Sequence, residues 1–205
     1  MTTSSQDQGS LIALDKDGQE LLFRGARTAN SFTDEPVTDE QLMEIYELFK
    51  WAPSSGNSQP LRIHAVRSPE AKHRLVPHML GANQEKAIAA PLVLILAADA
   101  DYHLHLDRLL PYVPNPAARH ADRDFRSKNS EFNAALQAGY LILAIRAAGL
   151  AAGPMSGFDA SGVDAEFFPD GTRHSILIVN VGKPGPEAWF ERLPRLDASE
   201  VIEFL

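Results

Sequence analysis

The sequence KNSEFNAALQAGYLILAIRAAGL, residues 128–150, predicts one long helix that ends near Gly149. Apolar side chains fall on nearly every face of this helix, and such a helix packs at the centre of a protein. The helix also offers more apolar surface than one small subunit needs, so we expect a homodimer. Its most apolar run, residues 138–145, is eight residues long, far short of the ~20 needed to cross a bilayer. We therefore expect no membrane partner.

Shorter elements lie on both sides of this helix. Strands are predicted at residues 61–66, 91–96 and 175–181, the second of them buried on both faces. Three helices are predicted from their start signals: one after Asp17, one after a Thr38–Gln41 capping box and one from Pro69. Two more are predicted at residues 163–168 and 197–205. Residues 153–157 are predicted to be a turn. Helices and strands mix without a regular βαβ alternation, which indicates an α+β protein with one domain over residues 1–205.

Composition limits the classes of function. The chain has 205 residues, a net charge of −8 and no cysteine, which excludes disulfides, zinc–thiolate sites and thiol nucleophiles. An acidic chain is not a general nucleic-acid binder, and any phosphate it binds must be met by a local cluster of arginines. Residues 1–10 are expected to be a disordered tail. Residues 1–9 lack the apolar core of a secretory signal, so a cytoplasmic location is expected.

Residues 101–126 differ in composition from the rest of the chain. They hold three prolines, four arginines and three of the seven histidines. A short helix followed by an irregular excursion is predicted, and long irregular segments in compact domains commonly form lids. If the substrate is a small carboxylic acid, the candidate carboxylate ligands are Arg119, Arg123 and Arg126, with no basis in the sequence for choosing among them.

Several familiar sites are not supported. There is no G-x-G-x-x-G or P-loop motif. His103 and His105 form an H-x-H that could bind a metal on a strand, but the segment is predicted to be helical, so the two rings would point apart. Ser156 is not in a G-x-S-x-G elbow, because Pro154 and Phe158 stand where glycines are needed. We predict no metal site and no catalytic side chain.

Three segments remain as candidates for cofactor chemistry. Residues 26–32 form a turn that carries a cation and hydroxyl groups, and residues 52–60 form a loop of small residues with side-chain amides. Such amides both donate and accept hydrogen bonds, which suits the imide edge of a flavin. The third segment, residues 192–195, places Arg192 and Arg195 late in an acidic chain. Each segment taken alone is also compatible with a solvated turn.

Together the segments resemble the nitroreductase family of FMN enzymes. The family elements are R-x-S-x-[KR]-x-[FY], P-S-S-x-N-x-Q-P, P-x-[ES]-G and a late R-L-P, and here they correspond to residues 26–32, 53–60, 154–157 and 192–194. The resemblance covers roughly residues 20–205. It implies the nitroreductase-like fold, in which helices surround a central, mostly antiparallel sheet with a long buried core helix, in an intertwined homodimer.

The resemblance also implies a site and a reaction. NAD(P)H, either NADPH or NADH, would reduce FMN, and a small-molecule acceptor would then take the hydride. The implied cofactor-binding residues are Arg27, Thr28, Asn30, Ser54, Ser55, Asn57, Gln59, Pro154, Ser156, Gly157, Arg192 and Arg195. Arg27, Arg192 and Arg195 would hold the phosphate, and Ser54 and Ser55 would come from the partner subunit. The backbone of Ser156 and Gly157 would lie near flavin N5, with Gly157 permitting the close approach.

A narrower branch, the malonic semialdehyde reductases, is similar over residues 26–30, 150–158 and 192–196, which makes malonic semialdehyde an expected acceptor. Three residues depart from the wider family. Ala26 stands where many members have Arg, and Asn30 stands where they have Lys or Arg. Ser156 stands where the classical nitroreductases have Glu. The change at Asn30 predicts a missing positive charge beside the flavin pyrimidine. Three alternatives stay open: a nitro- or quinone reductase, a flavin-binding protein without turnover, and a metal-dependent hydrolase that uses the histidines.

Overall fold

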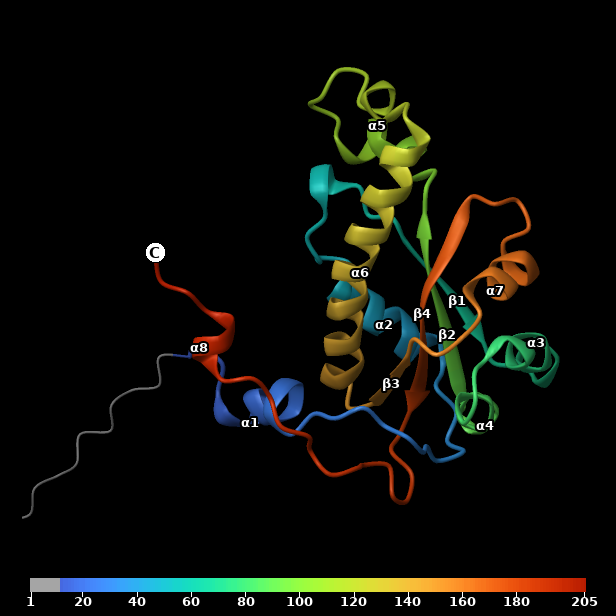
Figure 1. Cartoon of the computed structure of the whole chain (residues 1–205), viewed down its shortest axis with the longest axis vertical. Coiled ribbons are helices and arrows are strands. Elements are labelled where there is room, and N and C mark those ends of the chain that lie inside the picture. Colours follow the sequence, from blue (N-terminus) through green and yellow to red (C-terminus); the bar gives the residue numbers. More distant parts are fainter. Residues whose placement is uncertain (1–11) are drawn as a thin grey trace, which may run out of the picture.

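The computed structural model describes residues 12–205, so the expected tail at residues 1–10 lies outside the described residues. One antiparallel sheet forms the centre of the described chain (Figure 1). Its strands are β1 (Leu61–Val66), β2 (Leu92–Asp99), β3 (Ala151–Met155) and β4 (Arg173–Gly182), in the order β1-β2-β4-β3. The α+β class with an antiparallel sheet is therefore confirmed.

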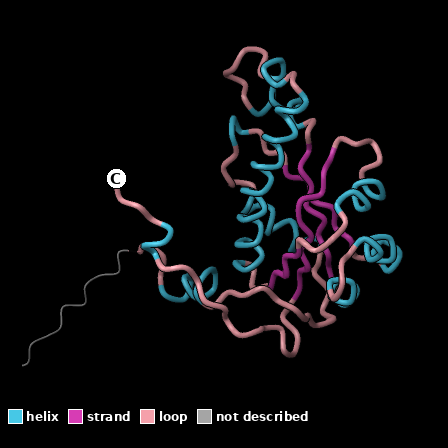
Figure 2. The backbone as a smooth tube through the Cα atoms, viewed as in Figure 1, coloured by secondary structure: helices cyan, strands magenta, loops and turns pink. Residues whose placement is uncertain are grey.

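Helices cover both faces of the sheet (Figures 1 and 2). On one face lie α2 (Asp39–Phe49) and α6 (Arg123–Ala147), and on the other lie α3 (Pro69–Leu75), α4 (Asn83–Ala89) and α7 (Ala160–Phe167). β2 shows why both layers are needed. Its residues Leu92, Leu94 and Leu96 belong to the core beneath α6, whereas Val93 and Ile95 belong to the core beneath α3 and α7. Burial on both faces of this strand is confirmed.

The long helix α6 differs from its prediction in two ways. It begins at Arg123, five residues before the predicted start at 128, because Asp122 caps it by accepting a hydrogen bond from the Phe125 N–H. Only part of its surface is buried in the chain. Phe132, Leu136 and Tyr140 are 66, 40 and 45% exposed and recur every fourth residue, so they form an apolar stripe that points away from the sheet.

Four further predictions need correction. Residues 153–155 belong to β3 instead of a turn, because they pair with residues 178–180 of β4. The first helix, α1 (Lys16–Gln19), is capped by Asp15 and not by Asp17, and a π-helical turn (Glu20–Arg24) follows it. The predicted C-terminal helix is only α8 (Ala198–Val201). The helix α4 was not predicted. The Thr38–Gln41 capping box of α2 is confirmed.

Two segments project from the core. Residues 101–126 form short helical turns, among them α5 (Leu106–Leu109), at one end of α6, and the C-terminal arm, residues 186–205, leaves the other end (Figure 1). The arm exposes apolar side chains along its length, including Trp189, Phe190 and Leu193. Among residues 12–205, no helix is both long and apolar enough to span a membrane.

Candidate functional site

The predicted cationic residues meet at one cavity. A cavity of about 190 Å³ is lined by Arg27, Thr28 and Asn30 from the segment before α2, and by Arg192 and Arg195 from the C-terminal arm. More than 160 residues separate these two segments in sequence, so the fold has brought together five of the predicted cofactor residues. Three guanidinium groups therefore line one cavity of an acidic chain, together with one carboxylate residue, Glu191.

Backbone contacts hold the two segments together. The Arg27 guanidinium donates to the Phe190 carbonyl at 3.2 Å, and Arg192 donates to the carbonyls of Arg24 and Ala26. Arg195 donates to the carbonyls of Leu193 and Pro194 in its own segment. These contacts use only some of the N–H groups of each arginine, because a guanidinium carries five. The arginines can therefore fix the arm and still donate to an anion.

β3 positions the segment before α2. The Ala29 N–H donates to the Ala152 carbonyl at 3.0 Å, beside Gly153. A Cβ at Gly153 would lie 2.6 Å from the Ala29 carbonyl oxygen, too close for any side chain. Glycine at residue 153 is thus required by the approach of residues 27–30 to the sheet.

A lysine that was not predicted lies beside Asn30. Lys86 on α4 donates from Nζ to Asn30 Oδ1 at 2.8 Å, and the Asn30 side chain also donates to the Thr28 carbonyl. Residue 30 itself carries no charge, but Lys86 brings a positive charge to Asn30 from another element. Asn83 and Lys86 are spaced by three residues, which places both on one side of a helix. Because α4 is not predicted as a helix from the sequence, this spacing is not used there.

The same helix also reaches the predicted segment 154–157. Asn83 Nδ2 donates to the Gly157 carbonyl at 3.1 Å, and the Leu80 N–H donates to it at 3.0 Å. A Cβ at Gly157 would lie 2.7 Å from Asn83 Nδ2, so a side chain there would displace the Asn83 amide that donates to the Gly157 carbonyl. The N–H groups of Ser156 and Gly157 have no acceptor among residues 12–205. Pro154 is half-buried in β3.

The remaining predicted residues, Ser54, Ser55, Asn57 and Gln59, lie elsewhere. The Asn57 side chain donates to the Leu109 carbonyl in α5 at 3.0 Å, and the Ser55 N–H donates to Asn133 of α6 at 2.6 Å. Both contacts place the loop at the α5 end of the molecule, whereas residues 26–30 lie at the opposite end of α6 (Figure 1). One copy of the chain therefore does not bring the two halves of the predicted site together.

This loop has an unusual backbone. Asn57 and Gln59 have φ angles of 48° and 43°, a region that costs energy for residues other than glycine. Three hydrogen bonds oppose the strain: the Gln59 N–H donates to Ser54 Oγ, the Gln59 side chain to Asn57 Oδ1, and Asn57 to Leu109. The amides of the loop are thus held in one arrangement before any ligand binds.

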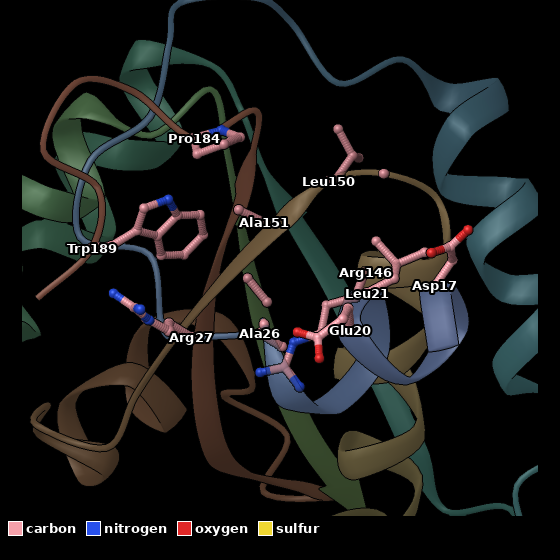
Figure 3. Close-up of a pocket in the computed structure, with 13 residues that line it drawn as sticks. Asp17, Glu20, Leu21, Ala26, Arg27, Arg146, Leu150, Ala151, Pro184 and Trp189 are labelled. Atoms are coloured by element: carbon pink, nitrogen blue, oxygen red, sulfur yellow. The ribbon is translucent and has the colours of Figure 1, made fainter. Parts of the chain in front are cut away.

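A larger cavity, about 500 Å³, shares the lining residues Ala26 and Arg27 with the first (Figure 3). Figure 3 shows Arg27 and Trp189 on one side of it and Glu20 and Asp17 on another. Arg146 also lines it and donates to the Leu22 carbonyl, while its Nε is buried without a partner among the described residues. Burial lowers the pKa of this guanidinium below its usual value.

The arginines predicted to bind a carboxylate separate into two groups. Arg126 donates to the carbonyls of Ala100, His120 and Ala121, and only 11% of its side chain is exposed. Arg123 donates to the Gly171 carbonyl at 3.0 Å. Arg126 therefore holds the excursion in place and is not a free ligand. Arg119 makes no side-chain bond among residues 12–205.

The histidines do not form a metal centre in the described part of the chain. His103 and His105 lie on one short 3₁₀ turn, and no three metal-ligating side chains come together within residues 12–205. Burial, followed by the charge of Arg126, lowers the pKa of His103.

Comparison with known proteins identifies the family. The model of the Nitroreductase family matches residues 24–183. The chain belongs to the nitroreductase family. A Streptomyces coelicolor protein named as a candidate NADH dehydrogenase/NAD(P)H nitroreductase is 53% identical over 93% of this chain and 97% of its own.

Solved structures of the family show the same fold. A candidate nitroreductase from Bacillus subtilis superimposes with a TM-score of 0.82 at 23% identity, over 92% of this chain and 99% of its own. A candidate nitroreductase from Exiguobacterium sibiricum, solved in complex with FMN, gives 0.81 at 20% identity, over 93% and 98%. The expected fold and the expected nitroreductase-family enzyme are both confirmed.

Proposed function

We propose that the chain is an FMN-dependent oxidoreductase that passes hydride from NAD(P)H to a small acceptor. The observation that carries the proposal is the cavity at which Arg27, Thr28, Asn30, Arg192 and Arg195 meet, with Lys86 against Asn30. When bound, FMN supplies the hydride chemistry, and the protein supplies binding and electrostatics.

The residues present fit this cofactor. A phosphate needs several N–H donors and positive charge, and Arg27, Arg192 and Arg195 offer both at one cavity. The imide edge of a flavin needs groups that donate and accept, and the Asn30 amide with the Lys86 ammonium offers such a set. The N–H groups of Ser156 and Gly157, which have no acceptor among the described residues, are suited to a ring nitrogen. Lys86 would favour negative charge that develops on the pyrimidine side.

A homodimer is part of the proposal. Within one copy, the loop of Ser54, Ser55, Asn57 and Gln59 lies far from the cavity lined by Arg27, Arg192 and Arg195, which we call the arginine cavity. We therefore infer that the loop completes the site of a second copy. The apolar stripe of α6 and the apolar residues of the arm support this inference, because contiguous exposed apolar surface marks an interface. Light scattering should give about twice the chain mass of 22.4 kDa. A flavin-loaded species of one chain mass would refute the shared site.

For the acceptor we propose a small carbonyl acid, with malonic semialdehyde as the candidate. The aldehyde would gain a hydride and a proton to give 3-hydroxypropionate, and NAD(P)H would become NAD(P)⁺. The support is the resemblance of residues 150–158 and 192–196 to the semialdehyde reductases. A nitro compound or a quinone is the second candidate, supported by the names of the Streptomyces coelicolor protein and its relatives.

The test begins with the purified protein. It should be yellow and release FMN on denaturation. Under anaerobic conditions, it should oxidise a single equivalent of NADPH or NADH per flavin and continue to turn over only when an acceptor is added. Arg192→Ala should weaken FMN binding roughly 10-fold or more, because charge-assisted hydrogen bonds contribute about 1.5–3 kcal/mol. Arg67→Ala, at an exposed pair with Asp39, is the matched control. A protein that takes up no FMN defeats the proposal, and one that binds FMN without turnover is a flavin-binding protein instead.

A further inference from the structure

A second polar cavity lies at the α5 end of the molecule. It has a volume of about 320 Å³, and its walls come from α2, β1, α5 and α6. Its polar lining consists mainly of Lys50, Gln59, Arg62, His105, Arg108 and Gln137. We call it the basic cleft, because no carboxylate among the described residues lines it although the chain as a whole has a net charge of −8.

The cations of the basic cleft are not equally available. Arg62 is paired with Asp99 at 2.7 Å and also donates to two carbonyls, and Lys50 is paired with Glu47. Arg108 makes no ion pair or side-chain hydrogen bond among residues 12–205, and neither does His105. Arg108 is therefore the cation that can bind an external anion.

A buried amide points to the same use. Gln137 is only 4% exposed and lines the basic cleft from α6. Its Oε1 accepts from the Leu61 N–H at 3.0 Å, which fixes the orientation of the amide. The Nε2 donor has no partner among residues 12–205. This donor is not among the described buried polar atoms that lack a partner, so it faces the open cleft and can donate to an acceptor that enters it.

The basic cleft is joined to the loop that the proposed function assigns to the flavin. Gln59, a member of that loop, forms part of its wall. Leu109, which follows Arg108 in α5, also lines the cleft, and its carbonyl accepts a hydrogen bond from the Asn57 side chain of the loop. A molecule in the cleft would therefore lie beside the residues that we expect to approach the cofactor.

We propose that the basic cleft binds an oxyanion carried by one of the two substrates, with Arg108 as its cation and the Gln137 side-chain amide as its N–H donor. This inference rests on the proposed function and gives it a substrate class. The shared chemistry is a carboxylate or phosphate group: either the carboxylate of an acid acceptor or the 2′-phosphate that distinguishes NADPH from NADH. It also names a cation other than the three sequence candidates, Arg119, Arg123 and Arg126, the last of which the excursion itself uses.

The test separates the two sources of the anion. Flavin-loaded protein is titrated by calorimetry with 2′,5′-ADP against 5′-AMP, and with 3-hydroxypropionate against 1,3-propanediol. Arg108→Gln should weaken binding of one anionic probe about tenfold and leave its uncharged or less charged partner unchanged. The expected loss is at the low end for a charge-assisted contact, because Arg108 is exposed. Arg67→Gln, distant from the cleft, should bind every probe as wild type does.

Steady-state kinetics give a second readout. In Arg108→Gln the KM of NADPH, or of the acid acceptor, should rise while the KM of NADH or of a quinone and the kcat stay unchanged. Equal effects on charged and uncharged substrates overturn the proposal, and so does an effect found in Arg119→Gln in place of Arg108→Gln.

Three further outcomes are decisive. If Arg108→Gln leaves anion binding intact but raises the monomer fraction in light scattering, the cleft holds acidic residues of a second copy's arm, and the proposal is overturned. If the wild type lacks turnover yet binds an anionic probe through Arg108, the cleft stands and the proposed function fails. If the wild type turns over and its anion binding does not depend on Arg108, the proposed function stands and the cleft proposal fails.

Discussion

Replacing Gly153 by alanine tests how β3 positions residues 27–30, the segment before α2. The new Cβ would lie 2.6 Å from the Ala29 carbonyl oxygen and 3.2 Å from the Phe32 ring. The contact to the Ala29 oxygen is a backbone contact, so rotation of a side chain cannot relieve it. An ordinary contact begins near 3.4 Å, so residues 29–30 must move by about 0.8 Å.

The expected magnitude follows from this displacement. Overpacking of this kind costs about 1–3 kcal/mol, and a protein of this size loses roughly 2–4 °C in Tm per kcal/mol. The shift also moves Arg27 and Thr28 within the arginine cavity. FMN affinity should therefore fall about tenfold, the equivalent of one weakened charge-assisted hydrogen bond.

A matched control separates stability from site geometry. Ala152→Gly removes a fully buried methyl group from the neighbouring position of β3, at a cost of about 1–2 kcal/mol, and adds no atom near Ala29. Thermal unfolding and titration of FMN fluorescence are measured on both variants. Only Gly153→Ala should lose affinity. If Gly153→Ala keeps the wild-type Tm and binds FMN within twofold of wild type, the close approach of Ala29 to β3 is not what positions the site.

Three other variants probe the frame around the site. Asp99→Asn should destabilise the protein by about 3 kcal/mol in urea unfolding, because Arg62 then loses its nearly buried partner; a loss below about 1 kcal/mol would contradict this. Arg126→Ala should lower the Tm without changing the preference for acid over neutral acceptors, since its guanidinium binds carbonyls of the excursion. Burial, and next the charge of Arg173, lower the pKa of His64 in the folded protein below the usual 6.5. As the pH falls, the unfolded chain therefore binds this proton before the folded chain does. The free energy of unfolding should decrease as the pH drops below about 6.5. His64→Gln should reduce that acid-side loss in unfolding measurements at about pH 7 and pH 5, and an unchanged slope would assign it to other groups.

Most of the fold is predictable from the sequence where apolar periodicity is strong, as in β1, β2 and α2. Prediction fails where local chemistry opposes the final structure. Glycine and proline dominate residues 153–155 and predict a turn, yet pairing with β4 makes these residues a strand. The helix α4 is missed because only Ala87 of its residues is buried, so it has no apolar stripe.

The candidate site is predictable in part for a related reason. The convergence of residues 26–30 with 192–195 can be expected only from the family resemblance, because no local pattern links segments so distant in sequence. Lys86 is missed because its significance depends on Asn30, a tertiary neighbour 56 residues away. The choice between Arg108 and Arg126 likewise requires knowing which guanidinium is already engaged. Hydrogen bonds to carbonyls leave no trace in sequence.

The strained loop at Asn57 and Gln59 has a consequence for engineering. A search for thermostable variants would favour glycine at both positions, since glycine adopts positive φ angles without cost. Each such substitution would relieve strain and at the same time remove a side-chain amide that ties the loop to itself or to α5. Under the proposed function, in which this loop completes the flavin site, heat resistance and catalytic turnover would then diverge in the selected variants. Screens that score survival alone would in that case accumulate inactive proteins with glycine at these two residues.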